Sequence, residues 1–178
     1  FGKSGAAKKH SRTFFARSTS DRAIVLANAE DGRGGEPNSL GAARVAARGR
    51  ATSCMTAEYL VDSNVLVYAY DAGDAVKQTR ALDVLEALVS DASGALSTQT
   101  LGEFFRVVTE KLRPRIAPGE AARQVEGLLR AWPTLPVTGP VVLEATRGVH
   151  AHGLPYWDAQ LWATARLNQV PVVLSEDF

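Results

Sequence analysis

Apolar and polar residues come in blocks along residues 58–178, and these blocks predict strands that lead into helices. An apolar run at residues 59–61 stops at the polar triplet Asp62-Ser63-Asn64, and apolar residues resume directly after it. This pattern predicts a buried strand that ends near Asp62, followed by a short helix. Further short apolar runs next to turn residues predict strands at residues 94–98, 135–138 and 170–174.

The longer stretches between these runs carry apolar residues at helical spacing. Residues 76–90 place valine, leucine and alanine on one side of a helical cylinder and charged residues elsewhere, which is typical of an amphipathic helix. Proline and glycine mark the ends of four more predicted helices, at residues 101–112, 118–132, 140–150 and 155–168.

The order of these elements predicts the fold class. Strands that alternate with one or two helices favour a parallel sheet, because parallel neighbours need long crossover connections. The helices in those connections cover both faces of the sheet. We therefore expect an α/β protein, a three-layer α/β/α sandwich with a central, mostly parallel sheet.

The composition changes near Met55, the only methionine. Residues 1–54 are rich in Gly, Ala, Ser and Arg and hold 10 Lys or Arg against 4 Asp or Glu, a net charge of +6. Residues 55–178 hold 10 against 15, a net charge of −5. We expect residues 1–54 to be a disordered or spurious upstream segment and residues 55–178 to form the domain.

Cysteine content and hydropathy indicate the cellular compartment in which the protein is expected. Cys54 is the only cysteine and lies outside the predicted domain, which excludes an intramolecular disulfide and a cysteine metal site and fits a reducing, cytoplasmic setting. The sequence has no apolar run near the roughly 18 residues that a membrane span requires. We expect no membrane association.

Acidic residues stand where the predicted strands end or the next helices begin. Asp62 and Asp177 follow strands, Glu103 lies in the first turns of the helix after the second strand, and Asp158 lies near the start of the last helix. In open parallel sheets, ligands bind beyond the carboxyl ends of the strands. We therefore expect these four carboxylates to converge in one crevice.

A cluster of four carboxylates is electrostatically unfavourable unless the groups are protonated or bind a cation. Magnesium suits an oxygen-only site, because it keeps several waters and takes part of its octahedral shell from protein. Such a site can position water against a phosphodiester and neutralise charge on the phosphate and the leaving oxygen. The pattern thus favours hydrolysis of a nucleic-acid backbone.

Four segments in this order resemble the acidic motifs of the PIN domain family, and in order and spacing they are most similar to VapC-like toxins. They are Val61-Asp-Ser-Asn-Val-Leu, Ser97-Thr-Gln with Gly102-Glu-Phe, Tyr156-Trp-Asp-Ala and Leu174-Ser-Glu-Asp-Phe. The resemblance implies a PIN-like fold and an endoribonuclease dependent on Mg²⁺ or Mn²⁺. It implies metal-binding and catalytic roles for Asp62, Glu103, Asp158 and Asp177, and supporting roles for Ser63 and Asn64.

The same resemblance implies the toxin of a toxin–antitoxin pair, with an RNA substrate, a cognate antitoxin and a homodimer. The family pattern continues past its last motif, so we expect the domain to be truncated at its C-terminus. Glu176 competes with Asp177 for the fourth position. The alternative function is a catalytically inactive PIN fold that binds protein or RNA.

Aromatic residues at helical spacing raise the question of base stacking. Beside Val and Leu such residues are more often part of a core than of a nucleic-acid surface. We expect core packing for Phe104, Phe105, Trp157 and Trp162.

Overall fold

The computed structural model describes residues 57–176, together with the backbone of residues 15–18 and 23–25. Four strands of the main domain were predicted from the sequence. They are β3 (Tyr59–Val61), β4 (Gly94–Ser97), β5 (Thr134–Leu135) and β6 (Val172–Ser175). Two further strands, β1 (Phe15–Ser18) and β2 (Ala23–Val25), lie in the first 54 residues. The boundary expected near Met55 falls outside the described residues and stays a prediction.

The predicted helices are all present. They are α2 (Ser63–Tyr70), α3 (Ala75–Ser90), α4 (Thr98–Glu110), α5 (Pro118–Ala131), α6 (Gly139–His152) and α7 (Tyr156–Leu167). Among the residues that the structure describes, none of these helices combines the length and apolar character needed to cross a bilayer.

The strands form one sheet in the order β2-β1-β6-β3-β4-β5. The pairs β6/β3, β3/β4 and β4/β5 are parallel, as the order of elements predicted. β1 joins β6 in antiparallel orientation, and β2 joins β1 in the same way. The mostly parallel sheet is therefore confirmed, with an antiparallel extension at its β6 edge.

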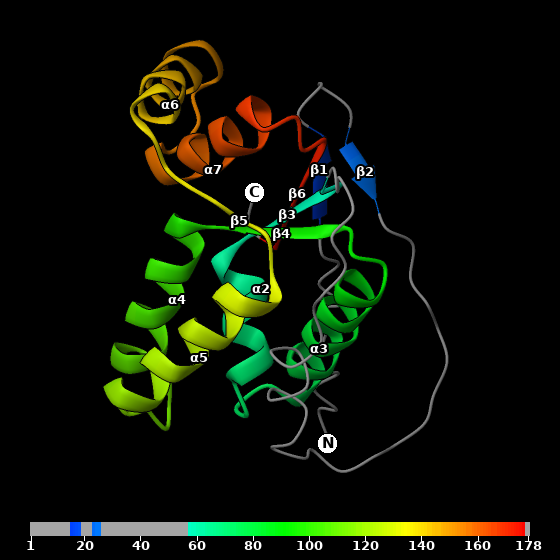
Figure 1. Cartoon of the computed structure of the whole chain (residues 1–178), viewed down its shortest axis with the longest axis vertical. Coiled ribbons are helices and arrows are strands. Elements are labelled where there is room, and N and C mark those ends of the chain that lie inside the picture. The colour runs from blue at the N-terminus through cyan, green and yellow to red at the C-terminus, as the bar shows by residue number, and fades with distance from the viewer. Residues whose placement is uncertain (1–14, 19–22, 26–56, 177–178) are drawn as a thin grey trace, which may run out of the picture.

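Helices cover both faces of this sheet, with α6 and α7 on one side and α2, α3, α4 and α5 on the other (Figure 1). Successive strand residues point to opposite faces. Accordingly, Leu60 and Val173 pack in the cluster that contains α7 residues, whereas Val61 and Leu174 pack with residues of α2 to α5. The predicted three-layer sandwich is the observed architecture.

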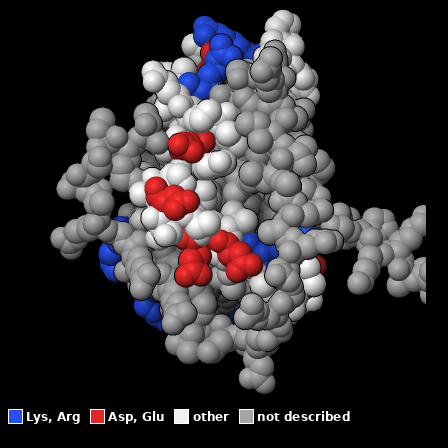
Figure 2. Space-filling model, turned by 90° about the vertical axis from the view of Figure 1, so that its right-hand side faces the viewer, with Lys and Arg blue, Asp and Glu red and all other residues white. Residues whose placement is uncertain are grey.

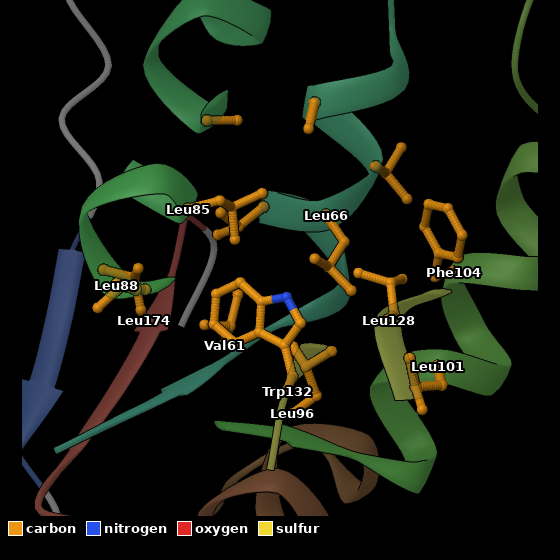
Figure 3. Close-up of a cluster of buried hydrophobic side chains, with 14 of the residues drawn as sticks. Val61, Leu66, Leu85, Leu88, Leu96, Leu101, Phe104, Leu128, Trp132 and Leu174 are labelled. Atoms are coloured by element: carbon orange, nitrogen blue, oxygen red, sulfur yellow. The ribbon is translucent and has the colours of Figure 1, made fainter. Parts of the chain in front are cut away.

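Trp132 closes the larger core against the sheet (Figure 3). It lies directly after α5, and its indole is almost fully buried. A Cβ atom at Gly94 would lie 2.4 Å from Cζ3 of Trp132, which no side chain could accept without displacing the indole. Glycine at the start of β4 therefore leaves the space that the indole of Trp132, directly after α5, occupies against the sheet.

Candidate active site

The starts of α2, α4 and α7 lie on the same side of the molecule, where the parallel strands end (Figure 1). Asp62 occupies the position between β3 and α2. Its backbone N–H donates to the carbonyl of Leu174 on β6 (2.9 Å), which fixes it against the neighbouring strand. Its carboxylate caps α2 by accepting from the N–H of Ser63 at 2.5 Å. Local helix capping therefore positions this carboxylate at the strand end.

The hydroxyl of Ser63 connects Asp62 to Glu103. Its Oγ lies 2.8 Å from Oε2 of Glu103 and 3.3 Å from Oδ1 of Asp62. A hydroxyl has one proton, so the shorter contact to Glu103 is the stronger hydrogen bond. Two acidic residues 41 positions apart in the sequence are thus brought to one side chain.

Asn64 and Ser175 hold the other oxygen of Asp62. Ser175 Oγ donates to Oδ2 of Asp62 at 2.7 Å, and Asn64 Nδ2 donates to Ser175 Oγ at 2.9 Å. The directions of donation are consistent, because Ser175 can donate one bond while accepting another. The side chain of Asn64 acts on Asp62 through Ser175.

Gln99 links Glu103 to the start of α7. Its Nε2 donates to Oε1 of Glu103 and to the backbone carbonyl of Trp157, both at 3.0 Å. Its Oε1 accepts from Nε2 of Gln160 at 3.0 Å. Asp158, which lies in the first turn of α7 and is partly buried, is therefore on a helix start that is tied to Glu103.

The pKa of Asp62 is raised above its ordinary value, chiefly because burial removes water from the carboxylate. Hydrogen bonds from Ser175 and Ser63 oppose this effect, whereas the nearby charge of Glu103 adds to it. Within residues 57–176, neither Asp62 nor Glu103 forms an ion pair with a Lys or Arg. Among the described residues, the donors that reach these two carboxylates are neutral hydroxyl, amide and backbone groups.

Glu176 belongs to a different cluster. Its carboxylate accepts from Nζ of Lys77 at 3.0 Å and from the hydroxyl of Tyr68. Lys77 also donates to the Tyr68 hydroxyl at 3.0 Å. With its side chain only 7% exposed, Glu176 is held by cationic and phenolic donors. This favours Asp177 over Glu176 for the fourth acidic position, although Asp177 itself lies outside the described residues.

The predicted site residues thus fall into three groups. Asp62, Ser63, Asn64 and Glu103 share one hydrogen-bond network, Asp158 lies on the helix start joined to it, and Asp177 is not described. Among residues 57–176 no three Asp, Glu, His or Cys side chains form a cluster that could hold a metal ion. The metal-binding assignment stays a prediction.

The oxygen atoms of Asp62 and its neighbours are of the kind that bind a hard cation. The carboxylates of Asp62 and Glu103 and the amide oxygen of Asn64 are oxygen ligands of the kind that magnesium prefers. Oδ1 of Asn64 is buried and has no hydrogen-bond partner among the described residues. A buried carbonyl oxygen without a donor is costly, and a cation would satisfy it.

Sequence reasoning missed the linking role of Gln99 and the contact of Ser175 with Asp62. Both residues stand inside the quoted motifs, but Ser175 lies far from Asp62 in the chain, and Gln99 lies far from its partners on α7. Gln99 and Glu103 are separated by four residues on one helix, and this spacing could have indicated their contact.

The expectation of core packing is confirmed for Phe104, which is fully buried. Trp162 is partly buried against the core formed by α6 and α7. The expectation of core packing is wrong for Trp157, which is 60% exposed at the start of α7, and for Phe105, which is exposed on α4. Helical spacing places a residue on a face of its own helix but does not say whether another element covers that face.

A parallel sheet flanked by two helical layers, with carboxylates at the strand ends, defines an α/β protein of the kind in which ligands bind beyond the carboxyl edge of the sheet. The chain belongs to the PIN domain family, whose model matches residues 59–178. No curated protein matches the chain.

Two solved structures are similar to the chain. The crystal structure of VapC20 from Mycobacterium tuberculosis, described as a sarcin-ricin loop cleaving toxin, is 20% identical and has a TM-score of 0.48. The match covers 63% of this chain and 84% of that chain. VapBC2 from Rickettsia felis, bound to a DNA fragment from its promoter, is 15% identical with a TM-score of 0.42, covering 60% of this chain and 78% of that chain.

Proposed function

We propose that this chain is an endoribonuclease that hydrolyses RNA phosphodiester bonds with Mg²⁺ or Mn²⁺. One observation carries the proposal: Asp62 and Glu103 converge on one Ser63 hydroxyl without a Lys or Arg partner within residues 57–176. Membership of the PIN domain family supports the same reading. Asp158 and Asp177 complete the proposed set of metal ligands and catalytic residues.

A bound divalent cation would supply charge neutralisation at the phosphate and a more acidic water. The chain's own residues orient the ligands. Ser63 and Gln99 each donate to one oxygen of Glu103, and Ser175 donates to Oδ2 of Asp62. These bonds hold both carboxylates in fixed directions, which reduces the reorganisation needed when the substrate binds.

The described residues on the side away from the strand ends include several acidic side chains (Figure 2). Figure 2 shows the side from which the chain enters β3 and β4, opposite the strand ends. Acidic side chains run down its middle, and Lys and Arg gather mainly at its top. Like charge repels phosphates, so these acidic side chains do not themselves attract RNA.

More specifically, we propose that the chain is the toxin of a toxin–antitoxin pair. It would act in the cytoplasm as a homodimer and be inhibited by a cognate antitoxin. Its support is the resemblance of the four motifs to VapC-like toxins. Co-expression with the protein encoded by a neighbouring small reading frame, followed by size-exclusion chromatography, should give a joint peak. Separate elution of the two proteins would remove this part of the proposal.

The hydrolase proposal is tested by metal removal. The purified full chain should cleave a fluorescently labelled RNA in Mg²⁺ or Mn²⁺, lose cleavage in EDTA and regain it when excess Mn²⁺ is added. A DNA of the same sequence serves as the control substrate. Unchanged cleavage in EDTA would contradict the metal role, and RNA binding without cleavage in either metal would favour the inactive binding module.

A further inference from the structure

Trp157 is an exposed aromatic side chain beside the proposed catalytic site. Its side chain is 60% exposed, and it is the immediate chain neighbour of Asp158. Tryptophan carries one of the largest apolar surfaces of any side chain, and leaving it in water forgoes a large burial free energy. An exposed indole at such a place is typical of a binding surface rather than of a core.

The backbone of Trp157 is tied to the carboxylate network. Its carbonyl accepts from Nε2 of Gln99, which also donates to Glu103, and Gln160 in turn donates to Gln99. The ring of Tyr156 lies edge-on to the indole, with centroids 5.2 Å apart and planes at 70°. The indole therefore sits on a backbone fixed relative to Glu103.

We propose that Trp157 stacks on an unpaired base of the RNA next to the scissile phosphate. This inference rests on the proposed function and deepens it, because it assigns a substrate contact to a residue that is not one of the carboxylates. Bases in a duplex already stack on each other, whereas unpaired bases can lie on an aromatic side chain. Any base offers a π-face, so the contact tolerates sequence variation.

The link to Glu103 favours RNA over a protein partner for this surface. The start of α7 lies close to Glu103, because Gln99 donates both to Glu103 and to the backbone carbonyl of Trp157. A single rigid ring suffices for stacking one base. A protein interface instead requires roughly 800 Å² on each partner. Burial of Trp157 against a second copy of the chain is an outcome that the test distinguishes.

The test measures RNA binding in the Asp62→Asn background, so that no substrate is consumed. Trp157→Ala should weaken binding of a labelled random-sequence single-stranded RNA 12-mer by about tenfold or more, while Trp157→Phe keeps most of the affinity. Binding of a 12-base-pair RNA duplex should change little. Leu167→Ala, which removes another exposed apolar side chain at the far end of α7, is the matched control and should bind like the parent.

Equal affinity of Trp157→Ala and the parent for the single strand overturns the proposal, as does an equal loss in Leu167→Ala. A change from dimer to monomer in light scattering, with RNA affinity unchanged, assigns Trp157 to a protein interface and also overturns it. The two proposals fail separately. Absence of RNA cleavage in either metal removes the hydrolase assignment and leaves the binding result, whereas an unaltered affinity of Trp157→Ala removes stacking and leaves the cleavage result.

Discussion

Ser175 and Glu176 are neighbours at the end of β6, yet their side chains join two clusters of opposite electrostatic character. Ser175 donates to Asp62, in a network where the acidic groups receive hydroxyl, amide and backbone donors. Glu176 receives the ammonium group of Lys77 and the hydroxyl of Tyr68. Within residues 57–176, the Glu176 cluster contains a cationic side chain, whereas Asp62 and Glu103 form no ion pair with Lys or Arg.

The pKa directions follow this difference. Burial raises the pKa of Asp62, and the charge of Glu103 adds to that effect. Burial lowers the pKa of Lys77, but its hydrogen bonds and charge interactions with Tyr68 and Glu176 together outweigh burial, so the pKa of Lys77 is raised overall. A carboxylate with its own lysine is suited to a structural role. A buried carboxylate pair without a cation is costly for folding and is suited to binding one.

The largest expected effect comes from Asp62→Asn. The substitution removes the charge that we propose holds the metal, but an amide oxygen can still accept from the N–H of Ser63 and cap α2. RNA cleavage should fall at least about a hundredfold, the scale of losing one group that stabilises transition-state charge. Circular dichroism should show that the helices are retained.

The matched control is Glu126→Gln on α5, which removes the same charge from an exposed carboxylate paired with Arg130. It should cleave RNA at the parental rate, because the pair lies on the surface. If Asp62→Asn cleaved RNA at the parental rate, the proposed role of the Asp62 carboxylate would be eliminated. The functional difference between the Asp62 and Glu176 clusters would then have no support.

Lys77→Met should break the second cluster and act on stability. It removes the ammonium group of Lys77 from the Glu176 carboxylate, which is 7% exposed. Removing one partner of a largely buried charged hydrogen bond costs about 1–3 kcal/mol. The free energy of unfolding, measured by urea titration, should fall by that amount.

Arg130→Met removes an ion pair with side chains 75% and 61% exposed. Exposed pairs contribute about 0–1 kcal/mol, so the urea midpoint of this variant should move much less. Equal losses in Lys77→Met and Arg130→Met would mean that the Lys77 cluster stabilises the fold no more than a surface pair does.

The elements were predictable because they depend on local pattern. Apolar spacing and proline positions place α3 and α5 within a residue or two of their observed bounds. The third strand is displaced: β5 is Thr134–Leu135 rather than residues 135–138. Pro136 has no N–H for a sheet ladder, and the N–H of Val137 donates to Oγ1 of Thr98 instead of to a strand.

The site was only partly predictable, because its contacts join distant residues. Motif order led to Asp62 and Glu103, but no pattern indicates that Lys77 would reach Glu176, 99 residues away. Exposure of Trp157 likewise depends on how α7 lies against the sheet. Long-range packing determines these contacts, and local periodicity carries no information about it.

The smallest expected effect is on how thermal stability depends on pH, measured in metal-free buffer with EDTA. The pKa of Asp62 lies above its ordinary 3.8 in the folded chain, so between these values the folded chain binds more protons than the unfolded chain. Stability contributed by this group therefore falls as the pH rises through that window. Above the window, the full penalty of the ionised carboxylate remains. Asp62→Asn avoids this penalty and should melt higher than the parent at pH 7.

The gain in melting temperature should shrink as the pH is lowered toward 4, and a chain of this size gains about 2–4 °C for each kcal/mol relieved. Saturating Mn²⁺ should raise the melting temperature of the parent, because a ligand that binds only the folded state stabilises it. The same Mn²⁺ should leave Asp62→Asn nearly unchanged. If Mn²⁺ raised both melting temperatures equally, or if the variant melted lower than the parent at pH 7 in EDTA, the uncompensated charge at Asp62 would not be what the cation binds.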